Sequence, residues 1–175
     1  MVRLSVIIPT KNNERDLERC LSSLQKQKFK DFELIVVDGH STDRTVDIAK
    51  KYGAVVTYES IGTRGGACNE GAKVARGEIL VFTDADAYFP PDWLEKIAKR
   101  FGSDEKLAAL GGVDVIGKDA NLLERILFLY DLAKKLPKNQ KEVALRIRGV
   151  NSSYRKEIFL KERGFNSKLR SIEET

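Results

Sequence analysis

The sequence alternates between short apolar runs and amphipathic stretches, and this alternation limits the folds open to the chain. The runs that predict buried strands are Leu4–Ile8, Leu34–Val37, Ala54–Tyr58 and Ile79–Thr83. The stretches with helical spacing are Glu14–Gln27, Asp43–Tyr52 and Ala67–Ala75. Strands that alternate with helices in this way predict an α/β fold, Rossmann-like, with a mainly parallel central sheet and helices on both faces.

The second half of the sequence predicts three further elements. Pro90-Pro91-Asp92-Trp93 begins an amphipathic helix that ends near Gly102, and Leu107–Val115 predicts a strand interrupted by Gly111-Gly112. Leu122–Leu136 predicts a strongly apolar helix. Burial in the core or in a homo-oligomer contact explains this helix best, and its Lys134-Lys135 end leaves a peripheral membrane contact as the alternative.

The length and the residue usage narrow the class of protein. A chain of 175 residues predicts a single domain, and because Thr175 follows a charged segment without a closing element, we expect a longer parent protein. The N-terminus enters a strand directly and no apolar run could cross a bilayer, which predicts a cytoplasmic location. The net charge of +5 comes from basic residues interleaved with acids, so no nucleic-acid partner is expected. Cys20 and Cys68 lack the spacing of metal ligands, so we expect both to be reduced and structural.

Two carboxylates follow the run Ile79–Phe82, in the sequence Asp84-Ala85-Asp86. A buried strand that ends in two acids places negative charge at the carboxyl edge of the sheet, where open α/β folds bind ligands. Mg²⁺ commonly bridges one or two carboxylates to the phosphates of a substrate. The doublet therefore predicts a divalent cation and a phosphate-containing substrate, although a doublet by itself suits a helix cap equally well.

Three other loops are expected at the same edge. Pro9–Glu14 leads from the first strand into a helix, and Asp38 ends the second strand, where it could accept the N–H of a base or a ribose hydroxyl. The stretch Gly62–Gly66 predicts a flexible loop around Arg64, a cation suited to phosphate. The sequence has neither G-x-G-x-x-G after the first strand nor a P-loop motif, so another kind of phosphate site is expected.

In their order along the chain, these motifs closely resemble those of the family 2 glycosyltransferases of the GT-A fold. The resemblance covers nearly the whole chain and rests on an ordered set of segments. They are Ser5-Val6-Ile7-Ile8-Pro9-Thr10 with Asn12 and Glu14, Val36-Val37-Asp38-Gly39-His40-Ser41-Thr42-Asp43, Asn69-Glu70-Gly71 followed by Ala75-Arg76-Gly77-Glu78-Ile79, and Phe82-Thr83-Asp84-Ala85-Asp86.

The resemblance implies a role for each matching residue. The nucleotide-sugar site would comprise Pro9, Thr10, Glu14, Asp38, Arg64, Asp84 and Ala85. Asp38 would contact the base and Asp84 would lie by the ribose and the metal, while Asp86 would ligate the Mg²⁺ or Mn²⁺ that bridges the diphosphate. Residues 1–86 would then form the nucleotide-sugar-binding half, and residues 87–175 the acceptor-side half.

On the acceptor side, the resemblance places the general base at Glu174, in the pair Glu173-Glu174 that follows the turn Gly164-Phe165-Asn166. Asn151 and Arg155, after Arg148-Gly149-Val150, are lesser candidates. The chain departs from the family pattern at several positions: Gly39-His40 replace Asp-Gly, Cys68 replaces an Arg for which Arg64 would substitute, and Glu174 replaces an Asp.

The resulting prediction is a metal-dependent inverting glycosyltransferase that uses a UDP-, GDP- or dTDP-sugar and a saccharide or lipid-linked acceptor. Two alternatives stay open: a nucleotide-sugar-binding module without full catalysis, and a nucleotidyltransferase. The second would ordinarily carry a glycine-rich basic loop where Pro9–Glu14 has no glycine. We expect His40 to be a solvated loop residue rather than a ligand. We expect Trp93 to pack in the core rather than contact a sugar.

Overall fold

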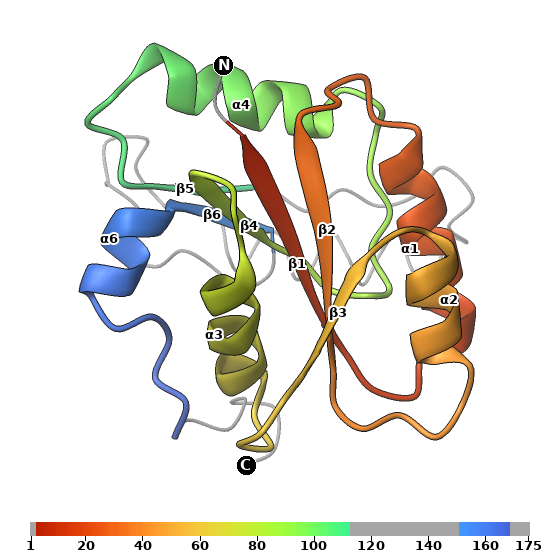
Figure 1. Cartoon of the computed structure of the whole chain (residues 1–175). Coiled ribbons are helices and arrows are strands. Elements are labelled where there is room, and N and C mark those ends of the chain that lie inside the picture. Colours follow the sequence, from red (N-terminus) through yellow and green to blue (C-terminus); the bar gives the residue numbers. More distant parts are fainter. Residues whose placement is uncertain (1–2, 113–150, 169–175) are drawn as a thin grey trace, which may run out of the picture.

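The computed structural model describes residues 3–112 and 151–168, which form one six-stranded sheet with helices on both faces (Figure 1). The strands follow the order β3-β2-β1-β4-β6-β5 across the sheet. Their bounds are β1 Leu4–Thr10, β2 Phe32–Asp38, β3 Val55–Tyr58, β4 Ile79–Phe82, β5 Ala109–Gly111 and β6 Ser152–Arg155. Strands β1 to β4 pair in parallel, whereas β6 pairs antiparallel with both β4 and β5. The predicted α/β class is therefore confirmed.

The helices divide between the two faces of the sheet (Figure 1). Their bounds are α1 Glu14–Gln25, α2 Thr45–Lys51, α3 Arg64–Val74, α4 Trp93–Ser103 and α6 Lys156–Lys161. Helices α1, α2 and α4 contribute side chains to one hydrophobic cluster, and α3 and α6 contribute to the other. In the described part of the chain, no helix combines the length and the apolar character needed to cross a membrane.

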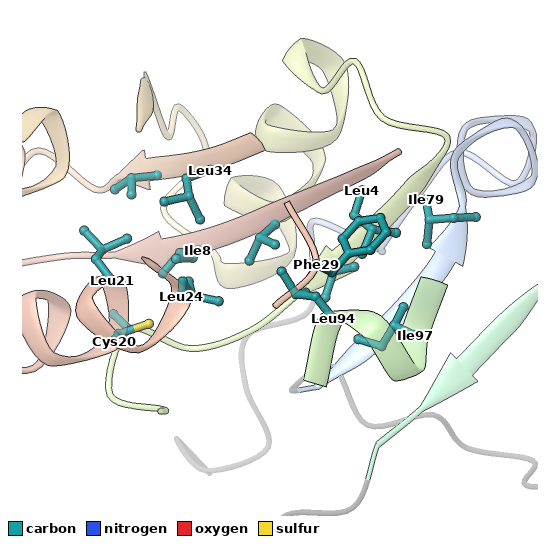
Figure 2. Close-up of a cluster of buried hydrophobic side chains, with 14 of the residues drawn as sticks. Leu4, Ile8, Cys20, Leu21, Leu24, Phe29, Leu34, Ile79, Leu94 and Ile97 are labelled. Carbon is teal, nitrogen blue, oxygen red and sulfur yellow. The ribbon is translucent and has the colours of Figure 1, made fainter. Parts of the chain in front are cut away.

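Strand β1 is buried on both sides, and its side chains alternate between the two clusters. Leu4 and Ile8 pack under α1 and α4, whereas Ile7 points to the α3 side. Figure 2 shows the first cluster, in which Cys20, Leu21 and Leu24 of α1 meet the side chains of the sheet. Because successive strand residues face opposite sides, a strand covered on both faces is mostly apolar, and Ser5, the buried polar residue near the start of β1, is hydrogen-bonded to Glu33 and to Gly77 N.

The prediction for the start of α3 was wrong. We expected a flexible loop through Gly66, but the helix begins at Arg64, and the hydroxyl of the N-cap Thr63 accepts a hydrogen bond from Gly66 N at 3.0 Å. The two glycines at 65 and 66 favour a loop by intrinsic propensity, but the threonine cap and the close packing of this turn outweigh them. A Cβ atom on Gly66 would lie 2.9 Å from Glu59 Oε1.

Other predicted elements differ in extent or lie outside the described residues. The strand expected at Leu107–Val115 is observed as β5 at Ala109–Gly111, and β6 at Ser152–Arg155 is a further strand. Val113 to Val150 are outside the described residues, so the apolar helix at Leu122–Leu136 stays a prediction.

Helix α3 lies unusually close to the sheet at Gly71. A Cβ atom at this position would be 2.4 Å from Ile7 Cγ2 and 2.9 Å from Val37 Cγ2. Neither neighbour can yield easily, because both belong to central strands that are fully covered. The absence of a side chain at this position therefore sets the distance between α3 and the sheet.

Gly71→Ala should destabilise the protein by about 1–3 kcal/mol in urea unfolding, because overpacking outweighs the roughly 1 kcal/mol that alanine gains in helix propensity. Lys73→Ala, on the exposed side of the same helix, is the matched control and should change stability by less than about 0.5 kcal/mol. Equal stability of Gly71→Ala and the parent chain would show that the packing at this contact is looser than described.

Candidate functional site

A pocket of about 450 Å³ lies at the carboxyl edge of the parallel strands, the lower edge of the sheet in Figure 1. Loops after four successive strands supply its walls. The lining residues are Pro9, Thr10, Lys11, Asn13, Val37, Gly39, Glu59, Gly62, Thr63, Arg64, Ala67, Asp84, Ala85 and Asp86. Most of the residues predicted for the nucleotide-sugar site are thus brought together, and Asp38 sits between two lining residues.

Asp38 is buried behind the pocket wall, with only 1% of its surface exposed. Its Oδ2 accepts a hydrogen bond from Ser41 N at 3.0 Å, while Oδ1 has no hydrogen-bond partner among the described residues. Thr10, opposite Asp38 in the β1–β2 register, also has a buried hydroxyl without a partner in that part of the chain. Since buried polar groups are normally paired, these two atoms mark a place suited to a polar ligand.

Glu14, also predicted for the nucleotide site, does not line the pocket. Its Oε2 accepts hydrogen bonds from Arg44 N at 3.2 Å and Arg44 Nε at 3.4 Å. Its own N–H donates to Asp43 Oδ2 at 3.1 Å. Glu14 therefore ties the start of α1 to the loop before α2, and a direct ligand contact stays a prediction.

The loops after β1 and β2 hold each other in place. Asn12 N donates to Ser41 Oγ at 2.8 Å, and Asn12 Oδ1 accepts from Thr42 N at 2.8 Å. Asn12 adopts a left-handed backbone with φ of 48°, which asparagine tolerates better than most residues. A hydrogen bond from the Thr45 hydroxyl lowers the pKa of Asp43, so this carboxylate stays charged while it accepts from the amides of both loops.

His40 is an exposed loop residue, as predicted, but it makes two local contacts. Its Nε2 lies 3.0 Å from Glu59 O, and its ring stacks on Tyr58 with the centroids 5.8 Å apart. These contacts fasten the β2 loop to the end of β3, at the rim of the pocket.

Glu59 is a pocket residue that the sequence analysis missed. It is buried, and its carboxylate accepts hydrogen bonds from three consecutive backbone amides: Ile61 at 2.6 Å, Gly62 at 2.7 Å and Thr63 at 3.4 Å. An acid directly after the β3 run and three residues before Gly62 was the available signal. Glu59 shapes the turn that begins α3, and its oxygens are already used by these amides.

The acid doublet lies against the first turn of α3. Arg64 Nε is 3.0 Å from Asp84 Oδ1, and Nη2 of the same guanidinium contacts the same oxygen. Although burial opposes its charge, neighbouring anionic groups raise the pKa of Arg64. Asp86 is exposed to solvent at the same end of the pocket.

The two cysteines are free, buried and close to the doublet, on opposite faces of the sheet. Burial, with a smaller effect of the Asp86 and Asp84 charges, raises the pKa of Cys20 to about 12. Burial likewise raises the pKa of Cys68 to about 11. Both thiols stay protonated at neutral pH and are unreactive, which agrees with the structural role predicted for them.

The donor set fits a hard divalent cation that shares its ligands with a substrate. No three His, Cys, Asp or Glu side chains gather as a metal cluster within residues 3–112 and 151–168. The doublet supplies carboxylates from Asp84 and Asp86, which both line the pocket. Mg²⁺ is commonly held by one or two carboxylates plus phosphate and water, so a complete protein cage is not required.

The segment after α6 is fastened to α3 beside the pocket. Asn69 Nδ2 donates to Phe165 O at 2.8 Å, and Phe165 N donates to Asn69 Oδ1 at 2.9 Å. Thr63 Oγ1 donates to Ser167 O at 2.9 Å. The turn predicted at Gly164 is present, with a glycine φ of 70°. The predicted base Glu174, with Glu173, lies outside the described residues.

The lesser acceptor-side candidates make contacts that hold the fold together. The Arg155 guanidinium donates to backbone carbonyls of Phe101, Asp104 and Leu107. Asn151 Oδ1 accepts from Trp93 Nε1 at 3.2 Å. Trp93 stacks on Phe89 and packs against the first hydrophobic cluster, as predicted. Arg148 to Val150 are outside the described residues.

A mainly parallel sheet with a pocket at its carboxyl edge is typical of open α/β folds, and the likeness to S. aureus TarS 1–349, with a TM-score of 0.74 and 28% identity, identifies this one as a GT-A fold. The sequence model for glycosyl transferase family 2 matches residues 5–162, and the chain belongs to this family.

Individual relatives agree with this assignment. The chain is 35% identical over 125 residues to a poly(ribitol-phosphate) beta-glucosyltransferase of Bacillus spizizenii, a match that covers 65% of this chain and 20% of the relative. Mannosyltransferase PcManGT from Pyrobaculum calidifontis, solved with GDP-Man and Mn²⁺, has a TM-score of 0.75 and 25% identity, over 96% of this chain and 48% of that one. S. aureus TarS 1–349, solved with UDP, has a TM-score of 0.74 and 26% identity, over 98% of this chain and 52% of that one. The chain thus spans between one fifth and about half of these proteins.

Glu59→Gln should destabilise the protein by about 1–3 kcal/mol, because the charge that strengthens these bonds is lost and the amide NH₂ group would face Gly62 N, which Oε2 now accepts from at 2.6 Å. Chemical denaturation measures this change. Glu78→Gln, an exposed substitution of the same kind, is the control and should stay within about 0.5 kcal/mol of the parent. Equal effects of the two substitutions would contradict the part assigned to Glu59.

Proposed function

We propose that this chain carries the donor site of a metal-dependent inverting glycosyltransferase, which moves a sugar from a nucleoside-diphosphate sugar to an acceptor hydroxyl. One observation carries the proposal: a single pocket gathers Thr10, Arg64, Asp84 and Asp86 from loops after separate strands, next to the buried carboxylate of Asp38. Membership of glycosyl transferase family 2 supports it.

The nucleoside would lie at the β1–β2 end of the pocket. Asp38 Oδ1 is a buried acceptor that lacks a partner among the described residues, so a base N–H or a ribose hydroxyl would satisfy it. The Thr10 hydroxyl is available beside it. UDP-, GDP- and dTDP-sugars all offer such donors, and relatives with UDP or GDP-Man bound support this range.

The diphosphate would lie toward the acid doublet. Asp86 and Asp84 would hold Mg²⁺ or Mn²⁺, and PcManGT with bound Mn²⁺ supports the choice of a divalent cation. Such a cation supplies charge to a departing diphosphate as a Lewis acid. Arg64 and Lys11, which both line the pocket, supply further positive charge toward the same group.

On the acceptor side we retain Glu174 as the general base. Ser167 O accepts a hydrogen bond from the pocket residue Thr63. Glu174 follows seven residues later, and seven residues of extended chain span at most about 24 Å. The base takes the proton of the acceptor hydroxyl. At the same time the hydroxyl oxygen bonds to the anomeric carbon, and the bond from that carbon to the diphosphate breaks. This single displacement inverts the anomeric centre without a covalent intermediate.

The proposal for the acceptor class is supported by the relatives alone. The Bacillus spizizenii relative is named for poly(ribitol-phosphate), which supports a saccharide, polyol or lipid-linked polymer as acceptor. The division into a donor half at residues 1–86 and an acceptor half at residues 87–175 stays a prediction. So do the cytoplasmic location, the homo-oligomer and the peripheral membrane contact.

Asp86→Ala should reduce metal-dependent donor hydrolysis or transfer at least about hundredfold, because the charge that stabilises the leaving diphosphate is lost with the cation. Assays with Mg²⁺ or Mn²⁺, before and after chelation, measure this effect. Asp16→Ala, an exposed acid on α1, is the control and should keep full turnover. Turnover of Asp86→Ala after removal of the metal would reject the metal assignment, and donor binding without any transfer would favour a binding module.

Asp38→Asn should weaken nucleotide binding at least about tenfold, because a charged acceptor is replaced by a neutral one. The stability of the free protein should stay within about 1 kcal/mol or rise, since a buried charge is removed. Thermal shift with UDP, GDP and dTDP plus Mn²⁺ measures both effects, and Asp47→Asn on exposed α2 is the control. Unchanged affinity for the best nucleotide would exclude Asp38 from the site.

A further inference from the structure

The first turn of α3 delivers a guanidinium to the acid doublet. Two nitrogens of Arg64 contact the same oxygen, Asp84 Oδ1, from a position 20 residues away along the chain. The two side chains are 35% and 31% exposed, and both line the pocket. A ligand that enters the pocket therefore meets this ion pair directly.

The backbone that carries Arg64 is held firmly, while its side chain is long. Thr63 caps the helix at Gly66 N, and the Glu59 carboxylate grips the amides just before the helix. The Cα position of Arg64 is thereby fixed beside the pocket. Its side chain, three methylene groups and a guanidinium, can still turn from one anionic partner to another without movement of the helix.

A divalent cation and the guanidinium compete for Asp84. Both are positive, and two cations beside one carboxylate oxygen repel each other strongly in a partly buried site. A diphosphate changes this balance, because its oxygens match the planar fork of arginine and offer it a second anionic partner. Once Arg64 turns to the phosphate, the Asp84 carboxylate is open to the cation.

We propose, on the basis of the function proposed above, that Arg64 is a positioning residue that exchanges partners during donor binding. It holds Asp84 in the free protein and moves to the diphosphate when the nucleotide enters, which releases Asp84 to the cation. The cation therefore binds weakly by itself, and the cation and the nucleotide strengthen each other's binding.

Arg64→Gln tests the proposal, because it should strengthen the binding of Mn²⁺, whereas an ordinary loss of function would weaken it. Without the competing guanidinium, Mn²⁺ alone should bind at least about fivefold more tightly than it binds the parent chain, the lower range of typical coupling between sites. UDP or GDP alone should bind more weakly. The factor by which the nucleotide raises Mn²⁺ affinity should fall. Electron paramagnetic resonance of free Mn²⁺, with and without UDP or GDP, measures all three quantities without any turnover.

Arg76→Gln is the matched control. Arg76 also forms an ion pair with a carboxylate, at 3.1 Å to Glu33 Oε2, but it lines a different pocket beside Phe32, at the start of β2. Arg76→Gln removes the same positive charge as Arg64→Gln and should leave Mn²⁺ binding unchanged. Circular dichroism checks that each variant is folded. Where Arg64→Gln fails to fold, Arg64→Lys serves instead, and its single-point contact should also let Mn²⁺ alone bind more tightly.

The outcomes separate the two proposals. If the parent chain binds Mn²⁺ and a nucleotide, and the Arg64 variants bind Mn²⁺ alone no more tightly than it does, the partner exchange is refuted and the proposed function stands. If the parent chain binds neither Mn²⁺ nor UDP, GDP or dTDP, the proposed function itself is refuted, and the exchange with it. Tighter Mn²⁺ binding in both the Arg64 and Arg76 variants would mark a general effect of charge and would also refute the exchange.

Discussion

The unequal lengths of the parallel strands determine where this molecule can bind a ligand. In the register of the sheet, Thr10 at the end of β1 lies opposite Asp38, whereas Phe82 at the end of β4 lies opposite Ile7. Strands β1 and β2 therefore extend past β4, and the chain after β4 must turn beside them. This step in the edge of the sheet sets the acid doublet further back from the carboxyl edge than the β1 and β2 loops, and the pocket lies between them.

Charge within the pocket is distributed along this step. The β2 end holds a buried carboxylate, and the β4 end holds two acids, of which Asp84 pairs with the Arg64 guanidinium. Glu59 contributes a further carboxylate, but this carboxylate accepts hydrogen bonds from backbone amides. The pocket is therefore neither uniformly acidic nor uniformly basic, which agrees with the proposed ligand, polar at one end and anionic at the other, and with the proposed cation beside the doublet.

The sequence predicted the parts of the fold that burial determines. Strands such as β1 and β4 are covered on both faces, so their apolar runs are unambiguous, and the residues that follow them must share one edge. The start of α3 was mispredicted because Gly65 and Gly66 look like a loop when the packing against Glu59 is unknown. Glu59 was missed for the same reason, since its function depends on a turn that folds back onto it. Neither effect is visible in the local pattern of the sequence.

Helix α3 supports the pocket on one side and the segment from Gly164 on the other. The Asn69 bonds and the Thr63 bond both end on backbone atoms, at Phe165 and Ser167. Such anchors are indifferent to the identity of the side chains they hold. The side chains of Ser167 and Lys168 make none of these bonds, so substitutions there would leave the main chain in its place, whereas Asn166 Oδ1 accepts from Lys168 N at 3.0 Å and helps to hold the turn.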